Sequence, residues 1–300
     1  MRPDQIRIVE VGPRDGLQNE AQPLTPQERV ALIEKLADAG LGDIEAGSFV
    51  SPRWVPQMVG SDEVLIALAE RKDLRLPVLV PNKKGYELSR GAGAREIAVF
   101  GAASETFSQR NINCSIADSL VRFGEVCALA KADGVVIRGY ISCVLGCPYE
   151  GDVDIAQVAR LAAQLAEMGC SEISLGDTIG VGTPDKARAL TKACASEVGL
   201  DNLSVHFHDT YGQALANILA CIEIGVTSVD AAVGGLGGCP YASGSAGNVA
   251  TEDVVYLLEG LGVNCSADLE QLVTITESLS RRLGHPPASR VARAQLAKRA

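Results

Sequence analysis

The feature that most constrains the fold is an alternation of strand-like and helix-like segments along the whole chain. A strand-like segment of aliphatic and β-branched residues recurs about every 30 residues, the size of one βα unit. Eight such segments are predicted, at residues 6–11, 43–46, 77–80, 96–100, 135–141, 172–175, 203–207 and 228–233. Because strands that alternate with helices form a parallel sheet, and eight strands close a barrel, we expect an α/β fold of the TIM (β/α)8 type.

Start and stop signals mark the helices predicted between these strands. Thr25, Pro26 and Glu28 form the pattern of a capping box with proline in the first helical turn. Gly40 is placed to end that helix in a left-handed conformation. Two later helices are predicted to begin at Asp154 and at Thr183-Pro184.

We expect residues 1–300 to form a single catalytic domain, because no glycine-rich linker or run of like charges divides the chain. The barrel core would span about residues 6–262, with residues 263–300 as a C-terminal helical extension. A doubly wound open sheet is the alternative, and its Gly-x-Gly fingerprint should follow the first strand. That place holds Gly12-Pro13-Arg14-Asp15-Gly16, where the proline and the two charges do not fit, so the barrel is favoured.

Composition bears on the core of the chain, and charge bears on its partners. Aromatic residues make up only 4% of the chain, so small aliphatic residues, alanine and glycine are expected to build the core. A formal net charge of -10 argues against a nucleic-acid partner, and it means that any anionic ligand would need a local basic patch. No apolar run is long enough to cross a bilayer, and the first residues carry no signal or transit pattern, so we expect no membrane partner and a cytoplasmic location. The nine cysteines show no disulfide framework, which is typical of a reducing compartment.

Polar and ionisable residues gather where the predicted strands end. In a parallel barrel the carboxyl ends of the strands build the active site, so these positions test for a site without reference to any motif. They hold Arg14, Asp15 and Gln18, then Glu45, then Tyr140, Ser142 and Cys143, then Asp177 and Thr178, then His206, His208 and Asp209, and finally a glycine-rich segment at 234–240 followed by Asn248. This recurrence predicts a site at one end of the barrel.

His206 and His208 are the most specific feature of the site. The chain has only 3 histidines, and residues two apart on a strand point to the same face. A single histidine would more often belong to the core, but two imidazoles that project together indicate a metal-ligand pair. With Asp15 and Asn248 they make a mixed nitrogen and oxygen set that suits Mg²⁺ or Mn²⁺, although Zn²⁺ or Co²⁺ could also occupy it.

Three further residues near these ligands have both a catalytic and a structural interpretation. Arg14 is either a surface ion pair or the cation that neutralises an enolate oxygen during bond cleavage. Glu45 either holds Arg14 in place or is a simple buried partner. Cys239 is either one more inert cysteine or a thiol that a flexible glycine-rich loop presents to the substrate.

Seven segments, in order along the chain, resemble those of 3-hydroxy-3-methylglutaryl-CoA lyases. They are Val9–Glu20, Gly47–Met58, Phe107–Asn113, Gly139–Pro148, Ser174–Gly180, His206–Gly212 and Gly235–Tyr241. The resemblance runs from about Ile6 to Gly262. It extends more weakly to a wider group of metal-dependent barrels, which includes isopropylmalate and homocitrate synthases and some 2-keto-acid aldolases.

The resemblance implies a reaction and a role for each site residue. The expected reaction is the divalent-metal-dependent cleavage of 3-hydroxy-3-methylglutaryl-CoA to acetyl-CoA and acetoacetate, by a homo-oligomer that is a dimer or larger. Metal binding would fall to Asp15, His206, His208 and Asn248, and catalysis to Arg14, Asp177 and Cys239, supported by Gln18, Glu45, Ser48, Tyr140 and Thr178. Departures from the family pattern are small: Ala46, Gly234 and Lys83 stand where Val, Ala and Leu are expected.

One basic segment is a candidate for the CoA phosphates. Asn82, Lys83 and Lys84 follow the third predicted strand, at the end of the barrel where the site is expected. An exposed lysine pair is more often a solvated surface. Two rival functions also stay open: a sister acyl-CoA synthase or aldolase, and a binding protein on the same barrel that has lost its catalytic activity.

Overall fold

The computed structural model describes residues 2–238 and 247–299. Within them the strands are β1 (Arg7–Glu10), β2 (Asp43–Ile44), β3 (Gly47–Ser48), β4 (Val78–Leu79), β5 (Glu96–Ala102), β6 (Val136–Ser142), β7 (Glu172–Asp177), β8 (Leu203–Phe207) and β9 (Ser228–Ala231). All are parallel and follow the order β2-β1-β9-β8-β7-β6-β5-β4-β3.

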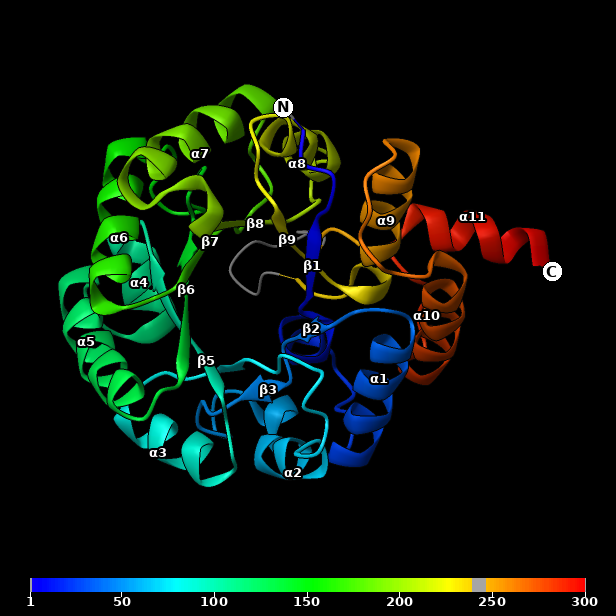
Figure 1. The fold of residues 1–300 in the computed structure, drawn as a ribbon, viewed down its shortest axis with the longest axis horizontal. Coiled ribbons are helices and arrows are strands. Elements are labelled where there is room, and N and C mark those ends of the chain that lie inside the picture. The colour runs from blue at the N-terminus through cyan, green and yellow to red at the C-terminus, as the bar shows by residue number, and fades with distance from the viewer. Residues whose placement is uncertain (1, 239–246, 300) are drawn as a thin grey trace.

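Helices surround this sheet on its outer side (Figure 1). They are α1 (Pro26–Asp38), α2 (Ser61–Ala67), α3 (Lys83–Gly91), α4 (Glu105–Ile112), α5 (Ile116–Ala132), α6 (Ile155–Met168), α7 (Pro184–Val198), α8 (Ala214–Ile222), α9 (Thr251–Gly260), α10 (Leu269–Leu283) and α11 (Arg290–Arg299). Short single-turn helices are η1 (Gly12–Gly16), η2 (Leu17–Asn19), η3 (Pro56–Met58), η4 (Leu200–Asn202) and η5 (Val233–Gly235).

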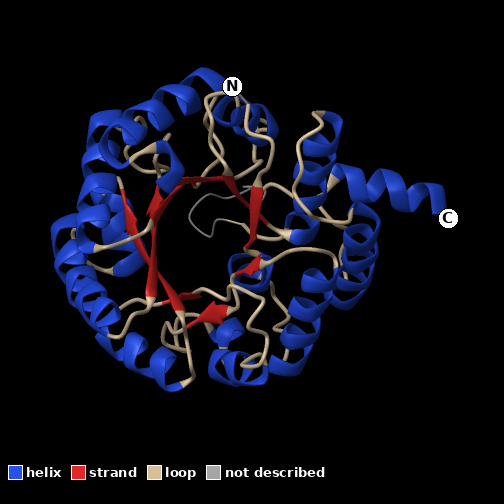
Figure 2. Ribbon diagram, in the orientation of Figure 1, coloured by secondary structure: helices blue, strands red, loops and turns tan. Residues whose placement is uncertain are grey.

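The sheet closes into a barrel, because its two end strands are pieces of one strand. β2 and β3 are separated only by Glu45 and Ala46. The N–H of Glu45 donates to the carbonyl of Glu10 on β1, and the N–H of Ala46 donates to the carbonyl of Pro77 beside β4, both at 2.9 Å. The ladder is therefore continuous around the ring that Figure 2 shows, and the predicted eight-stranded (β/α)8 barrel is confirmed.

The helix signals act as predicted, with one difference. The Oγ1 atom of Thr25 accepts the N–H of Glu28 at 3.2 Å, and a carboxylate oxygen of Glu28 accepts the N–H of Thr25 at 2.8 Å, so the capping box is complete. Gly40 has a φ of 94° and follows the end of α1. Thr183 precedes Pro184 at the start of α7, but its side chain makes no capping hydrogen bond.

Alternation along the strands divides an apolar layer from a polar barrel interior. Residues such as Ile137, Ile173, Val205 and Val229 belong to the main hydrophobic core. Their strand neighbours point to the other side of the sheet. These inward residues include Arg138, Glu172, Ser174, Ser204 and Asp230, which hydrogen-bond to one another inside the ring. The interior is therefore charged, unlike the core of small aliphatic residues that composition alone suggests.

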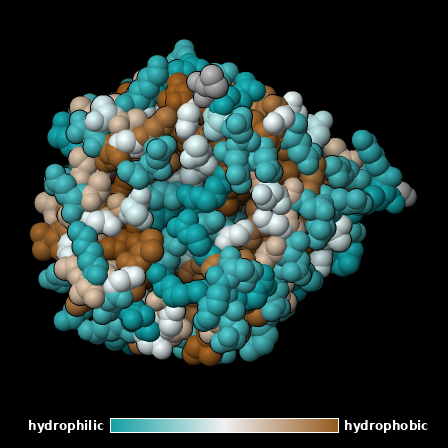
Figure 3. Space-filling view, in the orientation of Figure 1, coloured by the Kyte–Doolittle hydropathy of each residue, from teal (hydrophilic) through white to brown (hydrophobic). Residues whose placement is uncertain are grey.

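The C-terminal residues are helical, as predicted. The N–H groups of Arg290 and Val291, at the start of α11, donate to the carboxylate of Asp253 on α9. The far end of α11 projects away from the barrel (Figure 1). In the space-filling view of the same side, hydrophilic residues cover the centre of the face and hydrophobic residues form separated areas (Figure 3). Among the described residues, the helices are too short or too polar to cross a membrane.

Candidate metal centre

Asp15 is placed by the single-turn helix η1, which follows β1 directly. The turn brings the carboxylate to the carboxyl end of the barrel strands. Its Oδ1 atom lies 2.6 Å from Nη1 of Arg14 and accepts the amide N–H of Gln18 at 3.2 Å. Its Oδ2 atom accepts the amide N–H of Asn248 at 2.8 Å. Burial raises the pKa of Asp15, but Arg14, the two histidines and the hydrogen bond from Asn248 together lower it below the ordinary value, so the carboxylate is anionic.

The two histidines reach the same point from β8. His206 lies within the strand, and His208 follows it and forms an isolated β-bridge with Asn248. One ligand atom each from Asp15, His206 and His208 can be chosen so that all three lie within 4.8 Å of one another. The structure therefore brings together the four predicted ligands, although the other three lie more than 190 residues from Asp15 in the sequence.

The charges and hydrogen bonds of these side chains are compatible with the binding of a divalent cation. Nδ1 of His208 is buried and has no hydrogen-bond partner among the described residues. Burial, together with the neighbouring His206, lowers the pKa of His208 to about 4, so its ring is neutral and its lone pair is free. One carboxylate and two imidazoles suit a hard or borderline cation. The amide nitrogen of Asn248 donates to Asp15 and to the carbonyl of Leu236, so the amide oxygen would join this set only after the amide group turns over.

Arg14 is fully enclosed rather than a surface ion pair. Its exposed fraction is 5%, and its Nη2 atom lies 2.7 Å from Oε2 of the buried Glu45. The guanidinium carbon lies 5.7 Å from the centre of the Tyr140 ring, and the Tyr140 hydroxyl accepts an N–H of Arg138 at 2.8 Å. The surface interpretation of Arg14 is wrong, because Glu45 on the neighbouring barrel strand fixes the guanidinium beside the metal ligands.

Several predicted site residues hydrogen-bond backbone N–H groups of the loops at the strand ends. The carboxylate of Asp177 accepts the N–H groups of Val181 at 3.2 Å and Gly182 at 2.8 Å, and burial raises its pKa. Thr178 accepts the N–H of Cys143 through Oγ1 at 2.8 Å. The hydroxyl of Ser48 accepts the N–H of Val50 at 3.2 Å. These contacts shape the carboxyl end of the barrel around the metal centre.

The remaining predicted residues are separate from this group. Asn82 caps α3 by accepting the N–H of Gly85 at 3.0 Å, and Lys83 and Lys84 are exposed on the first turn of that helix. Cys239 lies outside the described residues, so its role stays a prediction.

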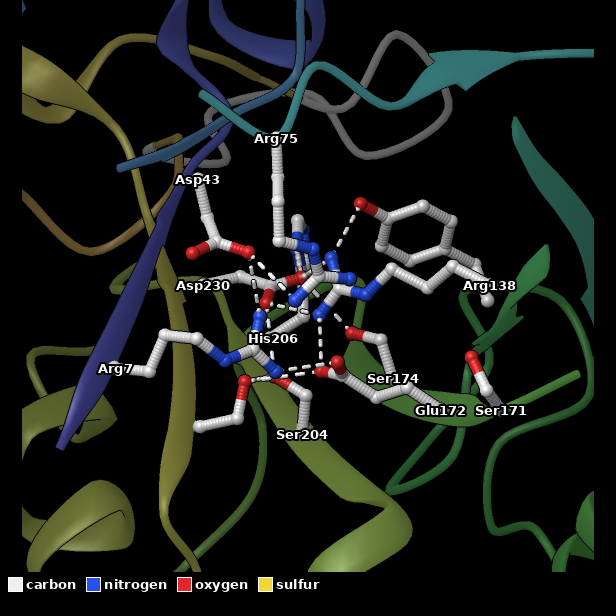
Figure 4. A network of polar contacts seen from close by, with 12 residues as sticks. Arg7, Asp43, Arg75, Arg138, Ser171, Glu172, Ser174, Ser204, His206 and Asp230 are labelled. Carbon is white, nitrogen blue, oxygen red and sulfur yellow. Dashed lines mark hydrogen bonds and ion pairs between the residues drawn. The ribbon is translucent and has the colours of Figure 1, made fainter. Parts of the chain in front are cut away.

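Two buried polar features of the barrel were not predicted from the sequence. One is Asp230, whose carboxylate lies against the ring of His206 inside the barrel (Figure 4). The other is a pair of buried carboxyl groups, Glu10 on β1 and Glu252 on α9. Glu10 accepts the N–H groups of Gly12 at 2.8 Å and Val233 at 2.9 Å, so it joins the segment of Asp15 to the start of the glycine-rich segment.

A signal for both groups is present in the sequence. Asp230 alternates with Val229 and Ala231, so its side chain must point to the opposite side of the sheet from the apolar core. Glu10 pairs with Ala231 and so lies on the other face of the sheet, toward the helices, where it accepts the hydroxyl of Thr251 on α9. A charged residue inside a buried strand needs partners, and that requirement marks it as part of a site.

Fold and geometry together define a (β/α)8-barrel protein with a candidate metal centre at the carboxyl ends of its strands. The chain belongs to the HMGL-like family, whose model matches residues 5–279.

Individual relatives are similar over nearly their whole length. A curated protein of Pseudomonas aeruginosa, named 3-hydroxy-3-isohexenylglutaryl-CoA/hydroxy-methylglutaryl-CoA lyase, is 56% identical over 296 residues, which are 99% of each chain. The crystal structure of hydroxymethylglutaryl-CoA lyase from the same species matches with a TM-score of 0.96 and 56% identity, covering 99% of both chains. An HMG-CoA lyase from Acinetobacter baumannii, in complex with coenzyme A and 3-methylmalate, matches with a TM-score of 0.93 and 35% identity, covering 97% of this chain and 95% of that one.

Proposed function

We propose that this chain is a divalent-metal-dependent lyase that cleaves 3-hydroxy-3-methylglutaryl-CoA to acetyl-CoA and acetoacetate. The observation that carries the proposal is the meeting of Asp15, His206 and His208 beside the buried Arg14, in a chain 56% identical to a lyase named for this substrate. Mg²⁺ or Mn²⁺ is the expected cofactor. This chemistry suits leucine degradation.

The proposed reaction begins at the tertiary hydroxyl of the substrate. A divalent cation held by Asp15, His206, His208 and Asn248 would polarise this hydroxyl and lower its pKa. Asp177 is the proposed base, because burial raises the pKa of its carboxyl group and makes the carboxylate a better proton acceptor than an exposed one. Loss of the hydroxyl proton turns the carbinol carbon into the ketone of acetoacetate, and the bond to the carbon next to the thioester breaks.

The electron pair of the broken bond stays on the CoA fragment as a thioester enolate. Arg14 is proposed to neutralise the enolate oxygen, because Glu45 holds its guanidinium rigidly and burial strengthens the attraction. Cys239 is proposed to give its thiol proton to the enolate carbon, which completes acetyl-CoA. No lysine needs to form a covalent adduct in this scheme.

Substrate contacts complete the proposal. Tyr140 has its pKa raised well above the ordinary value by burial, so its hydroxyl is neutral and able to hydrogen-bond an acyl group. Gln18, Ser48 and Thr178 are proposed to line the acyl site. Asn82, Lys83 and Lys84 are proposed to meet the CoA phosphates; the two lysines are exposed and their charges would attract an anionic nucleotide.

The name of the 56% identical relative includes a second substrate, 3-hydroxy-3-isohexenylglutaryl-CoA. That compound would undergo the same bond cleavage with a longer group in place of the methyl. We propose the methyl compound as the principal substrate and the isohexenyl compound as a second candidate.

Product analysis tests this function. The purified chain is mixed with Mg²⁺ and each of the two thioesters, and the products are identified by mass spectrometry. Equal amounts of acetyl-CoA and acetoacetate from the methyl compound support the proposal. If neither thioester is cleaved, or if the chain instead condenses acetyl-CoA with a keto acid, the lyase assignment is wrong.

Two further properties are proposed with this function. Cys114, Cys127, Cys194 and Cys221, among the described residues, form no disulfide, which supports a reducing compartment such as the cytoplasm. We propose a homo-oligomer, a dimer or larger, as the active form. Light scattering measures the assembly, and fractionation of the source cells measures the compartment.

A further inference from the structure

The ring of His206 lies between two carboxylates. Its Nδ1 atom is 3.1 Å from Oδ2 of Asp230, and its Nε2 atom is 3.8 Å from Oδ2 of Asp15. His206 and Asp230 are direct partners in the register of β8 and β9. One nitrogen therefore faces the barrel interior and the other faces the metal centre.

Asp230 is itself held firmly in place. Arg138 donates to both of its oxygens, with Nη2 2.6 Å from Oδ1 and Nη1 3.2 Å from Oδ2. The hydroxyls of Ser204 and Ser174 donate to Oδ1 and Oδ2, each at 2.9 Å. The Asp230 side chain is fully buried, and Figure 4 shows it enclosed by these donors. A carboxylate with four other hydrogen bonds cannot turn away from the histidine without losing them.

We propose that Asp230 is a positioning residue of the metal centre. It accepts the proton on Nδ1 of His206 and thereby keeps the lone pair on Nε2, directed at the cation. A neutral imidazole carries one proton, so the hydrogen bond at one nitrogen determines which nitrogen can bind a metal. This inference deepens the proposed function and rests on its metal site.

The network also provides a matched control. Arg138 continues to Glu172 at 3.0 Å, Glu172 pairs with Arg7, and Arg7 lies 3.0 Å from Asp43. Asp43 is therefore an aspartate in the same polar network. Its ion-pair partners are Arg7 and Arg75, whereas Asp230 contacts the proposed metal ligand His206. Substituting it with asparagine makes the same chemical change at a distance from His206.

The D230N variant should reverse the tautomer of His206. Arg138 makes its shorter contact with Oδ1 of Asp230, so the amide oxygen of the asparagine should occupy the position of Oδ1. Its NH₂ group then occupies the position of Oδ2, next to Nδ1 of His206. Nδ1 then accepts a hydrogen bond, and the proton moves to Nε2. A proton on Nε2 blocks the atom that faces the cation.

Two readouts test the proposal in the whole chain. The first is the ¹⁵N spectrum of histidine-labelled, metal-free protein, recorded at a pH high enough for every imidazole to be neutral. This spectrum is simple to assign because the chain has only 3 histidines. The second is the dissociation constant for Mn²⁺, measured by electron paramagnetic resonance. We expect D230N to show the reversed tautomer at His206 and to bind Mn²⁺ about 10- to 100-fold more weakly. D43N should match the wild type in both.

The outcomes separate this inference from the metal site itself. The inference is overturned if D230N keeps the wild-type ring signals and Mn²⁺ affinity, or if D43N weakens Mn²⁺ as much as D230N. If H206A binds Mn²⁺ normally, the proposed metal centre fails instead. Should D230N not fold, S204A decides, because it removes one donor from Asp230 and keeps the charge: a several-fold weaker Mn²⁺ affinity with shifted His206 signals supports the role, and wild-type values refute it.

Discussion

His208 and Cys239 are assigned different tasks in the proposed reaction, and single substitutions separate them. H208A removes one of few protein ligands, so the cation should bind much more weakly. C239S replaces the thiol with a far weaker acid but removes no ligand, so Mn²⁺ binding should be unchanged while kcat falls by about 10²-fold or more. Metal titration and steady-state rates are measured on both variants. Near-normal kcat in C239S would show that another residue protonates the enolate.

The buried carboxyl groups of Glu10 and Glu252 predict an unusual dependence of stability on pH. Burial raises the pKa of Glu10 to about 7 and that of Glu252 to about 8. Between the ordinary pKa of 4.5 and these values, the folded chain keeps protons that the unfolded chain releases. The free energy of unfolding should therefore fall as pH rises through this window, by about 1.4 kcal/mol per pH unit for each fully retained proton.

The E252Q variant tests this expectation, because glutamine resembles the protonated carboxyl group and does not titrate. Urea unfolding at pH 5, 6, 7 and 8 should show a shallower decline in the free energy of unfolding for E252Q than for the wild type. E277Q, at a half-exposed carboxylate on α10, serves as the control. Parallel curves for wild type and E252Q would mean that Glu252 is ionised in the folded chain.

At the residue scale, the sequence predicted the groups that meet at the strand ends but not those behind them. His206 and His208 were predictable because their spacing alone places two imidazoles on one face. Asp230 was not predictable in this way, because it lies within its strand and its importance depends on a contact with His206 on the neighbouring strand. The partners of Glu10, from Gly12 to Thr251, likewise come together only when the barrel closes.

Two helices that begin with Thr-Pro allow a test of capping at the scale of the element. Thr25 caps α1 through its side chain, whereas Thr183 makes no capping hydrogen bond at α7, and both residues are exposed. T25A should lower the free energy of unfolding by about 1 kcal/mol, the usual value of a lost N-cap. T183A should change it little. Equal losses in urea unfolding would show that the capping box contributes nothing specific.

The first turn of α3 carries the proposed contact with the CoA phosphates. In K83E/K84E the reversed charges should raise KM for the thioester roughly two- to thirty-fold and leave kcat unchanged, since each exposed charge pair is worth about 0.2–1 kcal/mol. K35E/K72E makes the same change in net charge at two exposed lysines on the α1 and α2–β4 segments, near the amino ends of strands. KM values that rise equally in both variants would indicate a general effect of charge.

At this scale the sequence predicted every barrel strand, with errors at the boundaries. The second strand was expected over residues 43–46, but the structure has Asp43–Ile44 and Gly47–Ser48 on either side of a change of partner. Strands in a closed barrel are tilted and staggered, so one strand can pair with one neighbour first and with the other later. That change depends on the closure of the whole sheet, which local patterns do not contain.

The interior of the barrel is the main feature of the whole molecule that the sequence analysis did not predict. Composition suggested a core of small aliphatic residues, and the layer between strands and helices has that character. Inside the ring, charged side chains instead link Arg7 and Asp43 to Glu172, Arg138 and Asp230. Buried charges are costly unless they are paired, so this arrangement requires the closed barrel to hold every partner in place.

The central claim is that one cation at Asp15, His206, His208 and Asn248 is required for cleavage of the carbon–carbon bond. The direct measurement is a titration of chelator-treated protein with Mn²⁺, in which bound metal and the products from 3-hydroxy-3-methylglutaryl-CoA are followed together. We predict no products from metal-free protein, a rate that rises in proportion to bound Mn²⁺, and full activity at one ion per chain. Full activity in metal-free protein, or activity that returns without bound metal, would contradict the account.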